Sequence, residues 1–535
     1  MKFADISGAE LLIEVLRAEG TDTVFGNGGA TEIPMMLEFN RADDLRYVLG
    51  LQEGTVVGMA EGYSRATGKP AFVSLHGAVG VGNAEVALYN ALTTRVPMVV
   101  TAGQTDLRHM LTEPLLSGDV AGMARPVVKW VYEVTHLTEL APALHRAYRE
   151  AMTPPMGPVL VSIPLNVQNE RGPAETGRPG PWPRPVAGDV TELVSVLKAA
   201  GPGELAVVLA SDIHLAGAGR AAVALAESLR APVWGTPFAG VNPFPTVHPL
   251  WRGYLPPTQA AHIREVLGGF AKVLHIGPRP FPVVHYDPEP MLPDTELLQV
   301  VATAGQLGSH RPVRAGAAGD LDLTLRALVR ELGRDAAPAP LTPALRRAGF
   351  TLERPMPPSA AVDVLTSTLP ADTLLVDEAW CISPRLRREY RTTESGRYFW
   401  GEGTGLGWAM PAAIGLSLGH RERVVCVVGD GSAMFCPQAL WSAAEQEAPV
   451  TFVVVDNGSY LVVESQISAR IPGKEKYRGT DLRHPAIDFA ALATSMGVDG
   501  HTAGGAAEFA RLLSKSLESG RPSLIHVRVA KEERK

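Results

Sequence analysis

The sequence contains very little cysteine, with residues only at Cys381, Cys426 and Cys436. Three thiols without metal-ligand spacing provide neither a disulfide framework nor a zinc site, and such sparse usage is typical of a reducing compartment. The start of the chain also lacks the apolar core of a signal peptide, and Ser7 is placed to cap an amphipathic helix there. We therefore expect a cytoplasmic protein.

Long hydrophobic runs and an excess of positive charge are missing as well. No uninterrupted apolar stretch reaches the length of a membrane span, and the formal net charge is −7 at pH 7. The absence of a basic stripe argues against a nucleic-acid-binding surface. With 46% hydrophobic and 20% charged residues among 535, the composition is that of a globular protein with room for about three domains.

Short apolar runs alternate with helix-like segments in three successive blocks, a pattern that predicts parallel sheets with crossover helices. PAFVSLH and VPMVVTAG are typical of the first block, LAVVLAS and KVLHIGP of the second, and TLLVDEA and VVCVVGDG of the third. We interpret the proline-rich stretches NERGPAETGRPGPWPRP and DAAPAPLTPALRRAG as linkers between the blocks. The predicted fold is α/β, with doubly wound, mostly parallel domains at residues 1–168, 189–335 and 359–530.

Two apolar runs of the third block end in a polar residue followed by glycine, Asp430 in VVGDGS and Asn457 in VVVDNGSY. Ligands of open parallel sheets bind beyond the carboxyl ends of the strands. Small residues there let the backbone approach an anion, and carboxylate and amide oxygens are hard ligands that suit Mg²⁺. Either segment alone could be a tight turn, but the interval between them fits one helix and one strand. This spacing favours a magnesium and phosphate site.

The pair resembles the GDG…N motif of thiamine diphosphate enzymes, and the resemblance covers essentially the whole chain. LGLQEGTVVGMAEGYSRA, APVWGTPFAGVNPFPTVHP and GLGWAMPAAIG are most similar to segments of the benzoylformate decarboxylases. The resemblance implies thiamine diphosphate and Mg²⁺ as cofactors, with a pyrimidine-binding N-terminal domain, a middle domain and a diphosphate-binding C-terminal domain. The matching metal ligands are Asp430, Asn457 and the carbonyl oxygen of Ser459.

The resemblance also assigns contacts to the organic cofactor. Glu53 matches the activating glutamate that reaches the aminopyrimidine from a neighbouring subunit, although an acidic residue in a first helical turn could simply be stabilising. Leu406 matches the bulky residue that holds the cofactor in its bent conformation. Diphosphate contacts are expected from Gly431, Ser432 and Tyr460. Ser383 is expected to share this role, because Trp380 and Cys381 replace small hydroxyl residues.

Residues close to the substrate follow from the same matches. His76 in LHGAVG matches a histidine that moves protons to and from the substrate, and a capping or core histidine is the alternative. A second histidine is expected in IGPRPFPVVHYDPEP, where an ungapped match gives Val284 and a slip of one residue gives His285. The substrate pocket is expected to include Ala30, Asn83, Trp400 and Val463.

Ala30 occupies the position of a serine that orients the substrate carboxylate in the decarboxylases. Such a hydrogen bond to a charged group is worth about 1.5–3 kcal/mol, and alanine at this position is similar to benzaldehyde lyase. Overall similarity therefore favours a carbon–carbon lyase that decarboxylates a benzoylformate-like 2-oxo acid to an aldehyde. Ala30 favours the alternative, an acyloin lyase or carboligase of benzaldehyde lyase or acetolactate synthase type.

A non-catalytic cofactor-binding relative is a third hypothesis, and the presence of Glu53 argues against it. Acetolactate synthases bind flavin in the middle domain, but the sequence has no clear fingerprint for flavin. If Glu53 and Asp430 serve one cofactor from two subunits, the smallest active form is a dimer. Because relatives are commonly dimers of dimers, we expect a homotetramer that acts on a small molecule.

Overall fold

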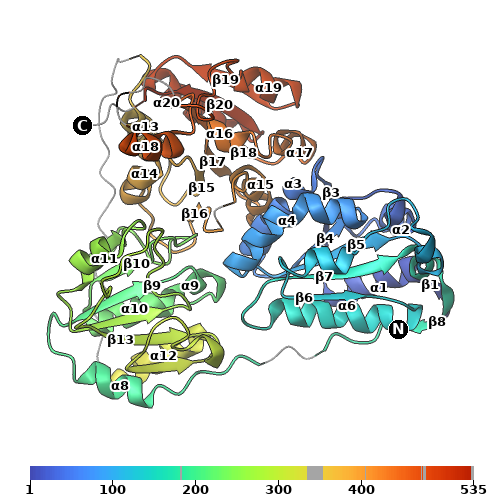
Figure 1. Ribbon diagram of the computed structural model, residues 1–535, viewed down its shortest axis with the longest axis horizontal. Coiled ribbons are helices and arrows are strands. Elements are labelled where there is room, and N and C mark those ends of the chain that lie inside the picture. Colours follow the sequence, from blue (N-terminus) through green and yellow to red (C-terminus); the bar gives the residue numbers. More distant parts are fainter. Residues whose placement is uncertain (181–183, 334–353, 404, 472, 474–476, 532–535) are drawn as a thin grey trace.

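The computed structural model describes residues 1–535 apart from 181–183, 334–353, 404, 472, 474–476 and 532–535. Within these residues it contains three six-stranded parallel sheets, one in each block (Figure 1). The predicted α/β class with three doubly wound domains is thereby confirmed. The expected linker at residues 335–349 lies outside the described residues. All three cysteines are free.

The N-terminal domain contains a sheet in the order β3-β2-β4-β5-β7-β6. Its strands are β2 (Thr23–Asn27), β3 (Arg46–Leu49), β4 (Ala71–Leu75), β5 (Met98–Gln104), β6 (Trp130–Glu133) and β7 (Pro158–Pro164). Its helices are α1 (Gly8–Glu19), η1 (Ala30–Glu32), α2 (Ile33–Arg41), α3 (Glu53–Thr67), α4 (Gly77–Thr94), η2 (Leu107–Thr112), α5 (Val120–Ala124), α6 (Leu137–Met152) and α7 (Leu165–Asn169). As predicted, the side chain of Ser7 caps α1, and Glu10 completes a capping box.

Two short strands differ from the expectation for their segments. β1 (Lys2–Ser7) precedes the predicted helix and pairs antiparallel with β8 (Arg171–Glu175). β8 belongs to the first of the two stretches that we interpret as linkers. It becomes a strand because the chain start offers it an unpaired partner, a contact between residues about 170 positions apart that no local pattern encodes.

The middle domain has the sheet order β11-β10-β9-β12-β13-β14. Its strands are β9 (Leu205–Leu209), β10 (Val233–Gly235), β11 (Trp251–Tyr254), β12 (Lys272–Ile276), β13 (Glu296–Val301) and β14 (Ala315–Ala318). Its helices are α8 (Thr191–Lys198), α9 (Asp212–Leu215), α10 (Gly219–Leu229), α11 (Ala260–Leu267), η3 (Ala304–Gln306) and α12 (Leu321–Leu332). The alanine- and leucine-rich faces of α10 and α12 cover this sheet with one hydrophobic core.

The C-terminal domain has the sheet order β16-β15-β17-β18-β20-β19. Its strands are β15 (Leu374–Glu378), β16 (Tyr398–Trp400), β17 (Val424–Gly429), β18 (Val450–Asp456), β19 (Asp499–Ala503) and β20 (Ser523–Arg528). Its helices are α13 (Pro358–Thr368), α14 (Ser383–Glu389), α15 (Ala409–His420), α16 (Asp430–Ala433), α17 (Ala439–Glu445), α18 (Leu461–Arg470), α19 (Phe489–Ser495) and α20 (Ala506–Ser519). β15, β17 and β18 are buried on both faces, which explains their continuous apolar sequences.

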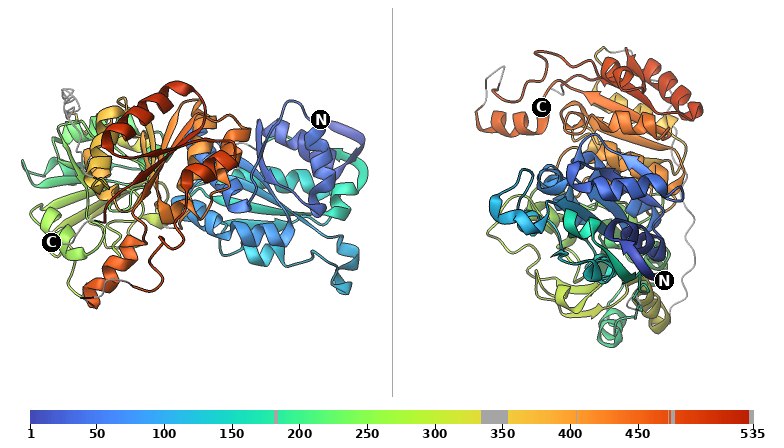
Figure 2. Two further views of the ribbon diagram at one scale, coloured as in Figure 1. Left: turned by 90° about the horizontal axis from the view of Figure 1, so that it is seen from above. Right: turned by 90° about the vertical axis from the view of Figure 1, so that its right-hand side faces the viewer.

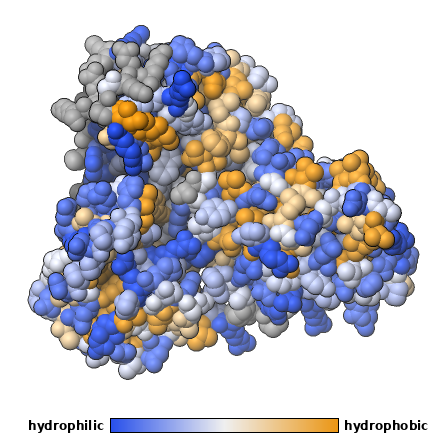
Figure 3. Space-filling view, in the orientation of Figure 1, coloured by the Kyte–Doolittle hydropathy of each residue, from blue (hydrophilic) through white to orange (hydrophobic). Residues whose placement is uncertain are grey.

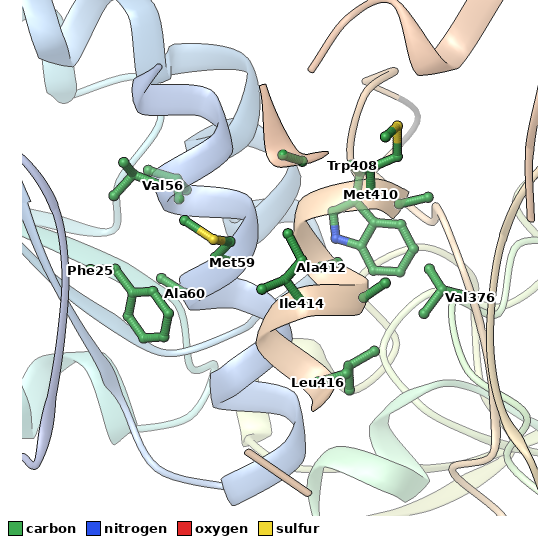
Figure 4. Close-up of a cluster of buried hydrophobic side chains, with 14 of the residues drawn as sticks. Phe25, Val56, Met59, Ala60, Val376, Trp408, Met410, Ala412, Ile414 and Leu416 are labelled. Atoms are coloured by element: carbon green, nitrogen blue, oxygen red, sulfur yellow. The ribbon is translucent and has the colours of Figure 1, made fainter. Parts of the chain in front are cut away.

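Helices α3 and α15 join the N-terminal and C-terminal domains through a single hydrophobic core (Figure 4). The helices approach closely because small residues face each other. A Cβ atom at Gly62 would lie 2.1 Å from the carbonyl oxygen of Ala412, and one at Gly415 would lie 1.9 Å from that of Met59. The middle and C-terminal domains lie together on one side of the molecule, with the N-terminal domain on the other (Figures 1 and 2).

Among the described residues, no helix is both long enough and apolar enough to cross a membrane.

Candidate active site

A cavity of about 320 Å³ lies at the carboxyl ends of β15, β17 and β18. These strands are neighbours in the sheet, so the residues that follow them meet at one edge. The cavity wall contains eight of the residues predicted for cofactor, metal and substrate binding: Leu406, Asp430, Gly431, Ser432, Asn457, Ser459, Tyr460 and Val463.

Asp430 is the first residue of α16 and is only 4% exposed. Its Oδ2 atom is buried without a hydrogen-bond partner among the described residues. Burial raises the pKa of Asp430 above its usual value, and the nearby carboxylate of Asp456 raises it further. An unpartnered buried carboxylate oxygen is costly, and a bound cation would remove that cost. The site therefore fits the predicted metal.

The turn after β18 holds the other two predicted metal ligands. Oδ1 of Asn457 accepts a hydrogen bond from the backbone N–H of Ser459 at 2.9 Å, which leaves a second lone pair on the amide oxygen. The ring of Tyr460 packs against the start of α16, where a Cβ atom at Gly431 would lie 2.5 Å from it. Glycine at this position is therefore a steric requirement of the cavity wall.

The opposite part of the wall is apolar. Trp380, Leu461, Val462 and Val463 lie beside Leu406 in the lining, and Val463 is 52% exposed in the single chain. Hydrophobic side chains left open to solvent next to a polar cradle are typical of a site that binds an organic group. This wall suits the thiazolium and aminopyrimidine rings or an apolar substrate.

A second group of predicted residues meets in the N-terminal domain. β3, β2 and β4 are adjacent, and their carboxyl ends lead to Glu53, Ala30 and His76 respectively. Glu53 is buried at the start of α3, where its Oε2 atom accepts a hydrogen bond from Nδ2 of Asn83 at 3.0 Å. Ala30 is exposed at the start of η1. The structure thus brings four predicted residues to one edge of this sheet.

Glu32 is a functional candidate that the sequence analysis missed. Its fully buried carboxylate lies 2.9 Å (Oε2) from Nδ1 of His76. It also accepts hydrogen bonds from the backbone N–H groups of Gly29, Gly77 and Gly103 and from the hydroxyl of Thr31. A carboxylate at Nδ1 favours the tautomer whose Nε2 is free to accept a proton. The available signal was an acidic residue just beyond a strand end, in GGATEIP.

The second predicted histidine lies on the surface of the single chain. His285 and Val284 are both exposed in the loop between β12 and β13, and neither lines the cavity. The backbone N–H of His285 donates to the carbonyl oxygen of Thr258 at 3.1 Å. The assignment of the second histidine to this loop remains a prediction.

Ser383 and Trp400 lie close to the site but point into protein. The hydroxyl of Ser383 is buried and donates to Oδ1 of Asp377 at 2.9 Å, so it is not available to a diphosphate. Trp400 is 3% exposed, with the guanidinium of Arg387 at 4.4 Å from its ring centroid. Its ring also contacts Trp380, at 4.9 Å between centroids. These contacts give no support to a diphosphate role for Ser383 or a pocket role for Trp400.

Glu378 is another residue of the cavity wall that the sequence analysis missed. It ends β15, and its buried carboxyl accepts hydrogen bonds from the backbone N–H groups of Gly407 (3.1 Å) and Ala409 (3.2 Å). Burial raises the pKa of Glu378 to about 8. The residue connects the sheet edge with the loop that carries Leu406.

The two groups of residues remain separate in one chain. The described lining of the cavity comes entirely from the C-terminal domain and includes neither Glu53 nor His76. The cavity offers a buried carboxylate and an amide oxygen, whereas the N-terminal edge offers an acid and a histidine.

Comparison with known proteins agrees with this division. Three family models match in succession: the thiamine pyrophosphate enzyme N-terminal TPP binding domain over residues 6–122, the central domain over 190–328, and the C-terminal TPP binding domain over 381–527. Benzoylformate decarboxylase of Pseudomonas aeruginosa is 36% identical, covering 96% of this chain and 97% of the relative. Acetolactate synthase isozyme 1 large subunit of Escherichia coli is 26% identical, covering 99% of this chain and 95% of the relative.

Solved structures give the same result. The thiamine diphosphate-dependent 4-hydroxybenzoylformate decarboxylase of Rhodococcus jostii RHA1 superimposes with a TM-score of 0.90 at 32% identity, covering 99% of this chain and 100% of that one. Benzoylformate decarboxylase of Polynucleobacter necessarius has a TM-score of 0.90 at 29% identity and covers 99% of both chains. The chain belongs to the thiamine pyrophosphate (thiamine diphosphate) enzyme family.

Proposed function

We propose that the protein is a thiamine diphosphate- and Mg²⁺-dependent lyase that decarboxylates an aromatic 2-oxo acid to an aldehyde. The observation that carries the proposal is the cavity at the ends of β15, β17 and β18. It combines the unpartnered buried oxygen of Asp430 with an apolar wall around Leu406. An amphipathic, anionic cofactor bound through a metal requires both features together.

Different residues of the cavity would bind different parts of the cofactor. Asp430, Asn457 and the carbonyl oxygen of Ser459 would bind Mg²⁺, while the backbone at Gly431 and Ser432 would bind the diphosphate. Thiamine diphosphate, once bound, supplies the nucleophilic carbon and the electron sink that cleavage of a bond next to a carbonyl requires.

The two separate groups of residues support a site shared between two subunits. Several large apolar side chains near the N-terminal edge are exposed in the single chain, including Val79 (56%), Val86 (58%) and Tyr89 (50%) on α4. Hydrophobic side chains also gather on the surface where the N-terminal and C-terminal domains meet (Figure 3). A second copy would bury such side chains and would bring its Glu53 to this chain's cavity.

Within such a dimer, two side chains of the N-terminal edge have distinct tasks. Glu53, held by Asn83, would exchange a proton with the aminopyrimidine nitrogen. His76, with Nδ1 held by Glu32, has its Nε2 atom available to move a proton at the substrate. Loss of CO₂ from a 2-oxo acid leaves one proton to be added at the former carbonyl carbon, and Nε2 of His76 would supply it after taking up a proton from solvent.

An aromatic substrate is supported by the relatives and by the wall of the cavity. Two of the relatives described above are named for benzoylformate and 4-hydroxybenzoylformate. Leu461, Val462 and Val463 offer aliphatic surface for such a ring. Because the substrate carboxylate meets Ala30 instead of a hydroxyl, we expect it to be bound weakly.

An acyloin lyase or carboligase is the second candidate, and Ala30 is the observation that favours it. The neighbouring Thr31 does not replace the missing hydroxyl, because it already donates to Oε1 of Glu32 at 2.7 Å. Without this hydrogen bond, the binding free energy of a substrate carboxylate exceeds that of a neutral ketone by a smaller amount. Assays with benzoylformate and with benzoin, recording CO₂ and benzaldehyde, separate the two candidates.

Mixing two inactive variants tests the shared site. Glu53→Gln and Asp430→Ala each lack one half of it, so homo-oligomers of either variant should be inactive. If the halves come from different subunits, a mixed dimer contains one intact site, and coexpression should restore up to about half of the activity per dimer. Mixed dimers without activity, together with inactive parents, would contradict the shared site.

We further propose a cytoplasmic homotetramer. The sparse free cysteines support the cytoplasm, the shared site supports a dimer, and two such dimers would form the tetramer. Light scattering of the purified protein measures the mass of the assembly directly, against 56.9 kDa for one chain.

A further inference from the structure

The loop between β16 and α15 carries Leu406 into the cavity, and small residues surround it in the sequence GEGTGLGW. A Cβ atom at Gly405 would lie 2.7 Å from Val86, and one at Gly407 would lie 2.6 Å from Phe435. Gly407 also has φ +90°, a conformation that side chains with a Cβ rarely adopt. The backbone on both sides of Leu406 is therefore pressed against neighbouring elements.

Asn90 of α4 holds the residue before Leu406. Its Nδ2 atom donates to the carbonyl oxygen of Gly405 at 2.9 Å, and its Oδ1 atom accepts from the N–H of Gly405 at 3.0 Å. Asn90 is buried, and both polar atoms of its side chain contact this one residue. The contact joins the N-terminal domain to the loop of the C-terminal domain.

Glu378 holds the residue after Leu406. Its Oε1 atom accepts a hydrogen bond from the N–H of Gly407, and its Oε2 atom accepts one from the N–H of Ala409. Leu406 itself is only partly buried, and its side chain lines the cavity. Two side chains from different domains thus fix the peptide groups that flank one partly buried apolar side chain.

We propose that Asn90 and Glu378 are positioning residues that set the place of Leu406 and, through it, the affinity for the thiamine part of the cofactor. The inference rests on the proposed function, in which Leu406 supports the bent cofactor. A side chain that supports a bent ligand must resist displacement, and a glycine-flanked loop resists only when its backbone is anchored. The residues proposed to bind the diphosphate and the metal lie on other elements, α16 and the turn after β18.

Because Leu406 and the diphosphate-binding residues lie on different elements, loss of a Leu406 anchor should lower the affinity for thiamine diphosphate but not for inorganic diphosphate. In Asn90→Ala, the affinity for thiamine diphosphate with Mg²⁺ should fall at least tenfold, while the affinity for inorganic diphosphate with Mg²⁺ should stay within twofold. Isothermal titration calorimetry on the purified full-length protein measures both. Leu406→Ala should show the same selective pattern, and the double variant Asn90→Ala/Leu406→Ala should lose little more than either single variant.

Conservative variants and a matched control sharpen the test. Asn90→Asp keeps an acceptor for the N–H of Gly405 but loses the donor, so its effect should be intermediate. Glu378→Gln should repeat the selective loss from the other side of Leu406. Ser211→Ala is the control, because Ser211 anchors the same loop at Glu402 (2.6 Å), away from Leu406. This variant should bind both ligands like the wild type.

Results that contradict the positioning role differ from results that contradict the proposed function. Equal loss of both ligands in Asn90→Ala and Asn90→Asp, or unchanged binding of thiamine diphosphate in both, would overturn the positioning role. A wild-type protein that binds no thiamine diphosphate in the presence of Mg²⁺ would instead overturn the proposed function.

Discussion

Nδ1 of His76 and Oε2 of Glu32 lie 2.9 Å apart, at the ends of two adjacent strands of the N-terminal sheet. The carboxylate has no exposed surface and three backbone N–H donors of its own, so it is itself fixed in place. The orientation of the histidine ring is therefore determined by a rigid neighbour, before any substrate arrives.

Replacement of Glu32 by glutamine should impair catalysis without affecting cofactor affinity. The amide removes the preference for the Nδ1–H tautomer, and kcat should lose part of the roughly 10²–10⁴-fold that positioned proton transfer contributes. Loss of hydrogen bonds to a charged acceptor should also cost about 1.5–3 kcal/mol of stability. Steady-state kinetics and thermal unfolding measure the two effects. If His76→Ala is slow while Glu32→Gln keeps wild-type kcat, the pairing has no catalytic role.

Asp430→Asn should abolish Mg²⁺-dependent binding of thiamine diphosphate. The neutral amide loses the charge that a divalent ion needs in a site with a single carboxylate ligand. Calorimetry with and without a chelator should show strong binding only for wild type with Mg²⁺. Asp106→Asn, which breaks an exposed ion pair with Arg108, is the matched control and should leave binding unchanged. Retained affinity in Asp430→Asn would place the metal elsewhere.

Gly62→Ala should destabilise the junction between the N-terminal and C-terminal domains. Its Cβ atom would lie 2.1 Å from a carbonyl oxygen of α15, so the helices must separate, at a cost of about 1–3 kcal/mol. Gly54→Ala in the same helix meets the end of the Gln52 side chain, at 2.8 Å, which caps α3 through the N–H of Thr55, and should cost less than Gly62→Ala. Thermal unfolding of both variants provides the comparison, and an equal effect would argue against close packing of α3 and α15.

His275 should make the middle domain sensitive to acid. The ring is fully buried, both ring nitrogens lack hydrogen-bond partners in the described structure, and burial lowers its pKa to about 4. The unfolded chain, with an ordinary histidine pKa near 6.5, binds the proton more readily. Stability from the neutral ring is therefore fully present above about pH 6.5 and is lost as the pH falls towards 4.

Calorimetric unfolding at pH 7 and pH 5 measures this effect. For one such histidine the loss between pH 7 and pH 5 is about 2 kcal/mol, and His275→Leu should remove that contribution. The remaining pH dependence will include the contribution of His214, because burial lowers the pKa of that residue to about 4 as well. Identical pH dependence in wild type and variant would mean that a hydrogen-bond acceptor stabilises the protonated ring of His275 in the folded protein, so that its pKa is not lowered.

The sequence predicted the three sheets because their central strands are continuous apolar runs that end in glycine or a polar residue. It missed β1 and β8, whose pairing depends on partners far apart in the chain and whose side chains are largely exposed. Edge strands of this kind have little hydrophobic pattern of their own, so only tertiary contact reveals them.

That the C-terminal residues line one cavity could be predicted because they follow strand ends in short motifs. Glu32 and Glu378 were missed for a different reason. Each carboxylate acts on the backbone or ring of another segment, 44 residues away for Glu32 and His76, and isolated acidic residues carry no motif. Ser383 was assigned by its chemistry alone, and the structure shows that Asp377 already uses its hydroxyl.

The shared core of α3 and α15 also has a consequence for synthesis of the chain. The glycine-lined face of α3 is complete once residue 67 has been made, but its partner helix ends only at residue 420. At ordinary rates of translation, roughly 20–70 s separate the two events. During this interval the whole middle domain, which has a hydrophobic core of its own, is made, while the apolar face of α3 has no partner helix. A nascent chain of this protein therefore depends on protection from aggregation until its last third emerges.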